Sequence, residues 1–357
     1  MDAEPFDVVV LGAGQAGLAA GYHLARLGLQ FVILDDGQQV GDSWRNRRES
    51  LRLFTPARLD SLPGLPFPAA TYAPPTKDGM ADYLCSYASR FNLPVRLRTR
   101  VDKVTADDGR FVISAGEHRF VASNVIGATG GQPKLPNFAR DLDPEICQLH
   151  SGQYRSPAQL KPGEVLVVGA GNSGAEISID AAGAGHRTWL AGRKTGTAPT
   201  VIYSRPTWWL ATHLITVSTP VGRRIAPRAL ARGAPLVRLR ESNLAAAGVR
   251  RAPRVENVEH GQPVFGDGRP RSVENVVWCT GYGWNLDWLQ INGVGPEAPV
   301  RFHRGIFEHP TGLYSVGRPF QFGIDSALIA GVGRDAGYVV SHIAQRRSAK
   351  GASSSPR

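Results

Sequence analysis

The chain has 357 residues, of which 42% are hydrophobic, and a formal net charge of +11. That length exceeds one compact domain of the usual size, so we expect two domains. The longest apolar stretch, residues 6–27, is interrupted by glycines and charged residues, and acids precede it, which excludes a membrane span and disfavours a signal peptide. Three distant cysteines without CxxC or zinc spacing fit a reducing, cytoplasmic location.

The first predicted element is an apolar, β-branched strand at Phe6–Leu11. The glycine-rich turn GAGQAG follows at Gly12–Gly17, and an Ala/Leu-rich helix then extends to Leu27. A second strand, Phe31–Leu34, leads into Asp35. This order of strand, glycine turn, helix, strand and acid is typical of a dinucleotide-binding unit.

The same unit recurs 157 residues later in the chain. Its elements are a strand at Val165–Val168, the turn GAGNSG at Gly169–Gly174, a helix at Ala175–Ala184 and a strand at Thr188–Ala191. Arg193 and Lys194 come after the second strand, where the first unit has an acid.

The glycines have the same physical role in both units. The first permits the tight turn, the second lets the backbone approach a pyrophosphate, and the third lets helix and strand pack closely. The helix N-terminus then presents free N–H groups and partial positive charge to the phosphates. Asp35 can accept hydrogen bonds from a ribose diol, whereas Arg193 and Lys194 can bind a 2′-phosphate. The first unit therefore suits FAD or NAD(H), and the second suits NADPH; a packing turn without ligand is the alternative for a single copy.

Two further strands close on a Thr-Gly turn, at Val125–Gly131 and Val276–Tyr282. Each is either an ordinary strand end or a return from one nucleotide domain to the other. Between Arg223 and Arg254 the chain has nine arginines and one acid, Glu241. Such a segment can attract nucleic acid or an anionic membrane, draw in polyanionic cofactors, or form a solvated helical face. Without a recognised motif, we expect no nucleic-acid partner.

Six motifs succeed one another along the chain: GAGQAG, GDSWR (Gly41–Arg45), ATG (Ala128–Gly130), HSGQY (His150–Tyr154), GAGNSG and CTGY. This order resembles the class B flavin-dependent monooxygenases, over residues 6–343. Within that class the chain is most similar to short bacterial flavin-containing monooxygenases and plant YUCCA-type enzymes. The segments SLRLFTPARLDSLPGLPFP, PTKDGMADYLCSYA and GLYSVGRPFQFGIDSALIAGVGRDA carry this closer similarity.

The resemblance implies an α/β fold of two nested Rossmann-like dinucleotide-binding domains. An FAD-binding domain would comprise residues 1–156 and 284–343, with an NADPH-binding domain, residues 157–283, inserted between them. Residues 345–357 are rich in Ser, Arg and Lys, and we expect them to form a disordered tail.

Two motifs depart from the family pattern. The fingerprint F-x-G-x-x-x-H-x-x-x-Y keeps its His and Tyr, but Pro144 and Ile146 replace Phe and Gly. It ends in Tyr154-Arg155 rather than Trp-Pro, which disfavours the lactone-forming Baeyer–Villiger chemistry. Animal-type members carry an active-site Asn where this chain has Leu53-Phe54-Thr55-Pro56, and Thr55 is the substitute candidate.

Several conspicuous side chains have structural interpretations. His150 is expected to hold the fold rather than to take part in chemistry. Trp208 and Trp209 are expected in core or interdomain packing rather than at a substrate entrance or membrane surface.

The resemblance implies that NADPH reduces FAD and that the reduced flavin reacts with O₂ as a C4a-peroxyflavin. One oxygen atom would then pass to a small organic substrate. The site residues are therefore cofactor ligands, and we assign no catalytic or metal-binding residue. For FAD they are Gly12, Gly14, Gln15, Ala16, Gly17, Asp35, Ser43, Trp44, Arg45, Val104 (through its backbone), Thr129, Gly130, Gly317 and Ser326; for NADPH they are Gly169, Gly171, Asn172, Ser173, Gly174, Arg193 and Lys194.

Two other classes of function stay open. The missing Asn and the altered fingerprint also fit an NADPH-dependent reductase or oxidase that passes electrons onward or makes hydrogen peroxide. A disulfide reductase is disfavoured because CxxC is absent. The Arg-rich segment suggests a non-enzymatic redox-sensing or membrane-docking protein. The substrate and the oligomeric state do not follow from the sequence.

Overall fold

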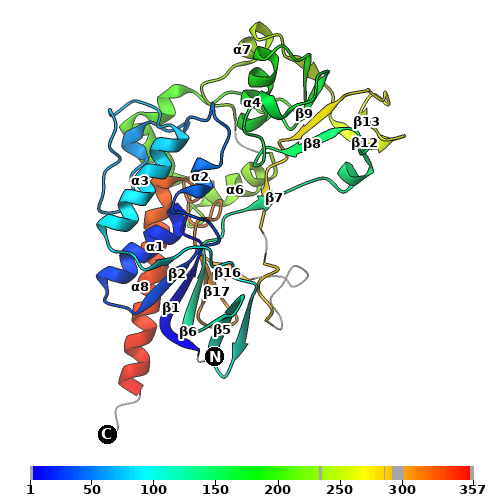
Figure 1. The fold of residues 1–357 in the computed structure, drawn as a ribbon. Coiled ribbons are helices and arrows are strands. Elements are labelled where there is room, and N and C mark those ends of the chain that lie inside the picture. The colour runs from blue at the N-terminus through cyan, green and yellow to red at the C-terminus, as the bar shows by residue number, and fades with distance from the viewer. Residues whose placement is uncertain (1–2, 233–234, 285, 292–300, 354–357) are drawn as a thin grey trace.

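The computed structural model describes residues 3–232, 235–284, 286–291 and 301–353. Two separate sheets, each covered by helices, form the two halves of the molecule (Figure 1). The chain enters the larger sheet first, crosses to the smaller one, and returns to the larger sheet near its end.

The larger sheet has nine strands. They are β1 (Glu4–Leu11), β2 (Phe31–Leu34), β3 (Val95–Arg96), β4 (Lys103–Asp107), β5 (Arg110–Ala115), β6 (His118–Gly127), β16 (Phe302–His303), β17 (Ile306–Phe307) and β18 (Leu313–Ser315). Strands β18, β6, β1, β2 and β3 are parallel, whereas β4–β5 and β16–β17 form antiparallel margins. Because parallel strands are buried on both faces, β2 and the second half of β1, Val8–Leu11, are continuous apolar runs.

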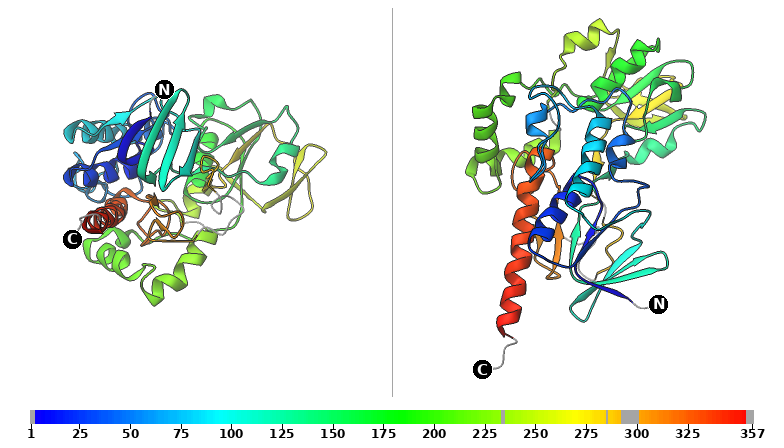
Figure 2. Two further views of the ribbon diagram at one scale, coloured as in Figure 1. Left: turned by 90° about the horizontal axis from the view of Figure 1, so that it is seen from below. Right: turned by 60° about the vertical axis from the view of Figure 1, so that its left-hand side comes forward.

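Helices α1 (Gln15–Arg26), α3 (Lys77–Arg90) and α8 (Ile329–Ser353) cover one face of this sheet, and the short helix α2 (Asp42–Arg45) joins them (Figure 2). Their buried apolar side chains form one cluster with β1 and β2. The opposite face packs against β4, β5 and the segment around Trp288. This packing holds the carboxyl ends of β1, β2 and β6 at one edge.

The smaller sheet contains five parallel strands in the order β11-β10-β9-β14-β8. These are β8 (Cys147–His150), β9 (Val165–Val168), β10 (Thr188–Ala191), β11 (Arg250–Ala252) and β14 (Asn275–Trp278). Helices α4 (Asn172–Gly183) and α7 (Glu241–Ala246) pack on one face, and the hairpin of β12 (Val255–Glu259) and β13 (Gln262–Phe265) lies on the other.

The two segments that connect the halves lie side by side. Strands β7 (Gln132–Pro133) and β15 (Tyr282–Gly283) form an antiparallel pair directly after the ATG and CTG turns. Helices α5 (Arg205–Leu214) and α6 (Pro220–Arg232) lie outside both sheets. The remaining short elements are 3₁₀ helices at Ala57–Leu59, Asn137–Asp141, Pro157–Gln159 and Thr200–Tyr203.

Both predicted strand–turn–helix–strand units are confirmed as β1-α1-β2 and β9-α4-β10. The predicted α/β fold with two dinucleotide-binding units is also confirmed. Strand β8 belongs to the smaller sheet although it precedes residue 157, where we expect the inserted domain to begin. Its pairing with β14 was not visible in the sequence, since β14 comes more than a hundred residues later.

The predicted disordered tail is a second difference. Helix α8 continues through residues 345–353, and residues 354–357 lie outside the described part of the chain. The preceding turns of α8 are anchored by buried Val332, Ala336 and Val339, so the later residues extend an existing helix instead of nucleating a new one.

Candidate functional site: a dinucleotide cleft and a second glycine turn

The glycines of the first turn are required by close backbone contacts. Gly12 has φ +103°, and a Cβ there would lie 2.5 Å from the carbonyl oxygen of Ala128. A Cβ at Gly17 would lie 1.8 Å from the carbonyl oxygen of Gly12. The first and third glycines therefore let α1 and the end of β6 approach β1. Gly17 has this packing role and does not line the cleft at the carboxyl edge of the sheet.

Gly14 differs from its neighbours because it faces open space. A Cβ at Gly14 would meet nothing nearer than the Ser43 hydroxyl, at 3.9 Å. It is the N-cap of α1, without a side-chain cap and without an acid in the first turn. The N-terminal N–H groups and the positive end of this helix therefore have no negative side chain in the first turn to satisfy them. This arrangement suits an anion such as a pyrophosphate.

The second turn repeats this geometry. A Cβ at Gly169 would lie 2.3 Å from the carbonyl oxygen of Cys279, and one at Gly174 would lie 1.8 Å from that of Gly169. A Cβ at Gly171 would meet no atom within 4 Å. Gly171 caps α4, again without a side-chain cap or an acid in the first turn. The two turns are thus built alike for backbone approach to an anion.

A cleft of about 1620 Å³ opens at the carboxyl edge of the larger sheet. Register explains its position, because Leu11 of β1 pairs with Leu34 of β2 and Gly127 of β6. The next residues of all three strands then meet at one edge. The predicted FAD residues that line this cleft are Gly12, Gly14, Gln15, Ala16, Asp35, Ser43, Trp44, Arg45, Thr129, Gly130 and Gly317. The structure therefore brings eleven of these candidates together.

Asp35 ties the glycine turn to the end of β2. One carboxylate oxygen accepts a hydrogen bond from the N–H of Ala13 at 2.6 Å, and the other accepts one from Gly37 at 2.8 Å. Each oxygen can accept a further bond, so a ribose hydroxyl can still bind there. Asp35 is held in place before any ligand arrives.

Helix α2 forms the wall opposite the turn. Trp44 Nε1 donates to Gln15 Oε1 at 3.1 Å, which links α2 to the first turn of α1. Arg45 pairs with Asp82 of α3 at 3.1 Å, and this partner raises the pKa of its guanidinium. The side chains of Gln15 and Arg45 are thus already bonded within the protein. They shape the wall of the cleft rather than offering free hydrogen-bonding groups to a ligand.

The cleft also contains cations that the sequence did not single out. Arg47, Arg98, Arg100 and Arg155 line it. Arg47 Nη1 donates to the Tyr282 hydroxyl at 2.7 Å. These side chains add positive charge beside the α1 N-terminus, which favours a polyanionic ligand. Their spread through the sequence gave no motif that could have identified them.

His150 has the structural environment expected from the sequence. Its Nε2 donates to the carbonyl of Gly281 at 3.0 Å, and its Nδ1 accepts from the N–H of Gly152 at 3.1 Å. Burial lowers the pKa of the imidazole, which favours its neutral form. The ring packs edge-on against Tyr282, so His150 fixes the CTGY turn at the mouth of the cleft.

Val104, assigned to the cofactor from the sequence, does not line the cleft. Val104 is fully buried in β4, its N–H donates to the carbonyl of Trp288, and its carbonyl accepts from Gln290. Its backbone therefore has no free donor for an adenine ring. Val101 and Trp288 line the cleft instead. Val104 points into the core because β4 pairs with β5 in an antiparallel hairpin, and this pairing was not visible in the sequence.

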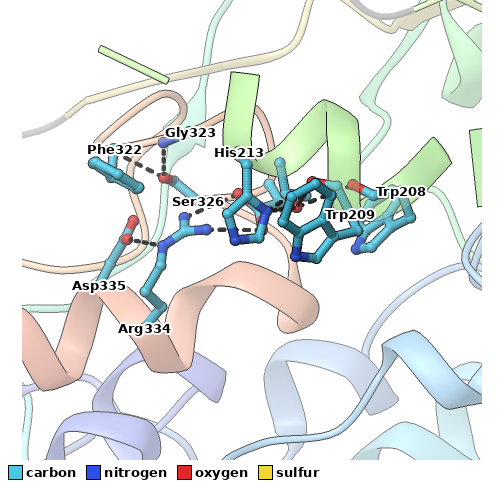
Figure 3. Close-up of polar contacts among 10 residues, drawn as sticks. Trp208, Trp209, His213, Phe322, Gly323, Ser326, Arg334 and Asp335 are labelled. Carbon is cyan, nitrogen blue, oxygen red and sulfur yellow. Dashed lines mark hydrogen bonds and ion pairs between the residues drawn. The ribbon is translucent and has the colours of Figure 1, made fainter. Parts of the chain in front are cut away.

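Ser326 also lies away from the cleft. Its hydroxyl accepts from the N–H groups of Phe322 and Gly323, each at 2.9 Å, and the side chain is fully buried (Figure 3). Ser326 therefore closes the turn that precedes α8 and does not line the cleft. Gly317, which the sequence also assigned to the FAD site, does line the cleft and has φ +93°.

The predicted NADPH residues surround the second turn and not this cleft. Arg193 and Lys194 are exposed directly after β10. Gly192 packs closely there, since a Cβ on it would lie 3.2 Å from the backbone nitrogen of Ala170. The backbone that carries these two cations thus starts next to the glycine turn, which is where a 2′-phosphate site would need them. Asn172 is already bonded, because its amide donates to Pro235 and accepts from Val237.

Two other sequence expectations concern residues outside the turns. Thr55 is buried and its hydroxyl donates to Asp60 Oδ1 at 2.6 Å, so it does not present a free group to the cleft. Trp209 is 59% exposed, which contradicts its expected place in packing. Trp208 is half-buried and stacks on Tyr203.

The cysteines and the acids do not form a redox or metal centre in the described ranges. Cys85, Cys147 and Cys279 are all unpaired. Desolvation raises the pKa of the Cys279 thiol to about 12, which disfavours the nucleophilic thiolate. Among residues 3–232, 235–284, 286–291 and 301–353, no group of three or more His, Cys, Asp or Glu side chains is arranged to hold a metal.

Known protein families share this arrangement of motifs. The pyridine nucleotide-disulphide oxidoreductase family matches residues 9–298. The chain belongs to this family. An uncharacterized CzcO-like oxidoreductase of Geobacillus kaustophilus is 36% identical, with 94% of this chain and 98% of the relative aligned. A probable indole-3-pyruvate monooxygenase, YUCCA7 of Arabidopsis thaliana, is 27% identical over 87% of this chain and 82% of its own.

Solved structures agree with this membership. A flavin-containing monooxygenase from Stenotrophomonas maltophilia superposes with a TM-score of 0.78 at 28% identity, covering 96% of this chain and 99% of that one. The predicted likeness to class B flavin-dependent monooxygenases, including the YUCCA-type enzymes, is confirmed, and the protein is an oxidoreductase. FAD and NADPH, the predicted cofactors, are those of this class of enzyme.

Proposed function

We propose that this pyridine nucleotide-dependent oxidoreductase is a monooxygenase that transfers one atom of O₂ to a small organic substrate. The proposal rests on a comparison of the two glycine turns. The turns have the same geometry, but the residue after the second strand is Asp35 in the first unit and Arg193 in the second. Two nucleotides of different chemistry are what a hydride transfer from NADPH to FAD requires. Three unpaired cysteines are in keeping with work in a reducing cytoplasm.

The residues of the large cleft fit FAD. Gly14 leaves room for the pyrophosphate, and the α1 N-terminus faces it. Asp35 would hold the adenosine ribose, and Ser43, Trp44 and Thr129 would border the ribityl and flavin part. Val101 replaces Val104 as the residue expected near the adenine.

The second turn fits NADPH in the same way. Gly171 leaves the approach open, and Ser173 is exposed beside it. Arg193 and Lys194 would bind the 2′-phosphate. The nested domain division agrees with this assignment: we propose that the FAD domain contains the larger sheet, and the NADPH domain the smaller sheet with β8.

Bound NADPH and FAD would supply the redox chemistry, namely two electrons as a hydride and the activation of O₂, with one oxygen atom going to the substrate and the other leaving as water. The chain itself has to bind, orient and exclude water. Arg47 and His150 hold Tyr282 from two sides at the edge of the cleft. The paired connections β7 and β15 keep the two halves, and hence the two cofactors, close together.

The test is the coupling of NADPH oxidation to oxygenated product. The FAD-loaded enzyme is supplied with NADPH, O₂ and a panel of amines, thioethers and 2-oxo acids, and NADPH, product and hydrogen peroxide are quantified. A monooxygenase forms product in proportion to NADPH with at least one substrate class. Stoichiometric hydrogen peroxide throughout would contradict the proposal and establish the reductase or oxidase alternative, which the engaged Thr55 hydroxyl favours.

A further inference from the structure

Helices α5 and α6 and the turn before them, residues 201–232, form an outward-facing hairpin beside the start of α8 (Figure 2). We call this segment the α5–α6 hairpin. It carries large apolar side chains that are about half exposed or more: Val201, Trp209, Leu210, Leu214, Val221 and Leu230. Single exposed apolar residues are ordinary, but six within one 32-residue segment are a concentration that indicates an interaction site.

The same hairpin is strongly cationic. Between Asp180 and Glu241 the chain has no Asp or Glu. Arg205, Arg223, Arg224 and Arg228 are exposed on the hairpin, without an ion pair among the described residues. The apolar side chains are therefore interspersed with arginines that lack acidic partners, so the complementary surface has to be negative.

On α5 the exposed residues have helical spacing. Arg205, Trp209 and His213 are four residues apart and share one face, with Leu210 and Leu214 beside them, whereas Thr212, at the other margin of this face, is buried. The Trp209 ring stacks on His213 with centroids 4.4 Å apart (Figure 3). His213 Nδ1 donates to the Trp209 carbonyl at 2.7 Å. The indole is thus held in an outward position.

The hairpin is firmly attached to the rest of the fold. The N–H of Val217 donates to Phe322 at 2.7 Å, and the N–H of Ile324 donates to Ile215 at 3.1 Å. A Cβ at Gly222 would lie 1.9 Å from the carbonyl oxygen of Thr216, so α6 starts in tight contact with this turn. The exposed side chains therefore result from a fixed orientation, not from loose packing.

We propose that the α5–α6 hairpin docks the enzyme on an anionic lipid bilayer. Trp and Leu beside arginines are the composition of a helix that lies in the headgroup region, where Trp binds the interface and each Arg adds electrostatic attraction. No helix within the described ranges is long and apolar enough to cross a membrane, so this docking is peripheral. The surface is separate from the cofactor cleft and does not depend on the proposed reaction.

Charge argues against the two other occupants. In a two-fold dimer the same patch would face itself, which would place arginines opposite arginines. Nucleic acid would satisfy the cations but leave Trp209, Leu210 and Leu214 exposed to water. An anionic bilayer is complementary to both the cationic and the apolar side chains.

The experiment is co-sedimentation of the FAD-loaded full chain with vesicles of phosphatidylcholine, alone or mixed with phosphatidylglycerol. We expect pelleting only with the anionic vesicles, and loss of binding as salt screens the charges. The triple variant R223Q/R224Q/R228Q should need about a hundredfold more anionic lipid for half-maximal binding, at roughly a factor of five per arginine. The variant W209S/L210S should weaken binding even at low salt.

Matched variants separate docking from general charge or misfolding. R90Q/R110Q/R119Q removes three exposed arginines elsewhere and should bind like the unaltered chain. R223K/R224K/R228K keeps the charge and should retain binding. Absence of pelleting at low salt overturns the proposal, and so does equal loss in the R90Q/R110Q/R119Q control. A dimer that W209S dissociates would assign the face to a second copy instead.

Discussion

At the scale of single residues, the difference between the two nucleotide sites depends on the side chain after the second strand of each unit. Asp35 is bonded to two backbone N–H groups and leaves acceptor capacity for a ribose. Arg193 is exposed and begins beside the turn at Ala170. Acid and cation at equivalent positions favour different nucleotides, because a 2′-phosphate is repelled by a carboxylate and attracted by a guanidinium.

Arg193→Ala should therefore weaken NADPH much more than NADH. Loss of a hydrogen bond to a charged group costs about 1.5–3 kcal/mol, which corresponds to roughly tenfold to a hundredfold in KM for NADPH. KM for NADH should change less than about twofold, because NADH lacks the phosphate. Steady-state kinetics with both nucleotides measures this, with Arg187→Ala, at the opposite end of β10, as the control. Equal losses for NADPH and NADH would show that Arg193 does not recognise the phosphate.

Asp60 is a buried acid with an unusual titration. It is 1% exposed, Thr55 donates to Oδ1, and Oδ2 has no hydrogen-bond partner among the described residues. Burial raises the pKa of Asp60 from 3.8 to about 7, and the Thr55 bond opposes the shift. The folded protein thus holds this proton more tightly than the unfolded chain does. Its contribution to stability is present below the unfolded pKa and declines as pH rises toward 7.

Asp60→Asn should remove this decline. At pH 8 the variant should be more stable than the unaltered protein, by up to about 4 kcal/mol, and near pH 4 the two should be similar. Urea unfolding at both values of pH measures the difference. Asp108→Asn, at an exposed turn, should leave the pH dependence unchanged. Parallel pH curves for Asp60→Asn and the unaltered protein would show that Asp60 titrates normally.

At the scale of elements, β1-α1-β2 and β9-α4-β10 are two copies of one strand–turn–helix–strand unit. In each, the middle glycine caps the helix in an extended conformation, with φ −73° at Gly14 and −78° at Gly171. Alanine can adopt these angles, and neither position has a protein atom closer than 3.9 Å to a new Cβ. A methyl group at either position would therefore obstruct a ligand without disturbing the protein.

Gly14→Ala and Gly171→Ala should have separate effects. Gly14→Ala should reduce bound flavin at least about tenfold in affinity, while the fold is retained. Gly171→Ala should keep its flavin and raise KM for NADPH by a similar factor. Flavin absorbance, circular dichroism and NADPH kinetics of both variants measure this. Flavin loss in both variants, or in neither, would contradict the assignment of the two turns to different nucleotides.

At the scale of the whole molecule, the two sheets are joined by contacts that come from distant parts of the chain. Arg48, 7% exposed, pairs with Glu176 of α4, and Ser50 donates to Asp180 of the same helix at 2.5 Å. Strands β7 and β15 pair across the connection. The loop after α2 therefore contains both Arg47, which lines the large cleft, and the side chains that bond to α4 of the second nucleotide unit.

The two nucleotide units could be predicted from local sequence patterns. Glycine spacing, apolar strands and the acid or cation at the strand end are such patterns, and β1, α1, β2, β9 and β10 are all close to their predicted positions. The order of motifs that identifies the family can likewise be recognised in the sequence. These features depend on short-range backbone geometry, which a local pattern specifies.

The residues that meet in the cleft and on the surface became known only from the packing of the elements. Val104 and Ser326 are bonded within the protein, Arg47 and Arg155 line the cleft, and Trp209 is exposed. These outcomes depend on contacts between segments far apart in the chain, such as the pairing of β8 with β14. A local pattern does not encode such contacts, because burial and hydrogen bonding are settled when the elements pack.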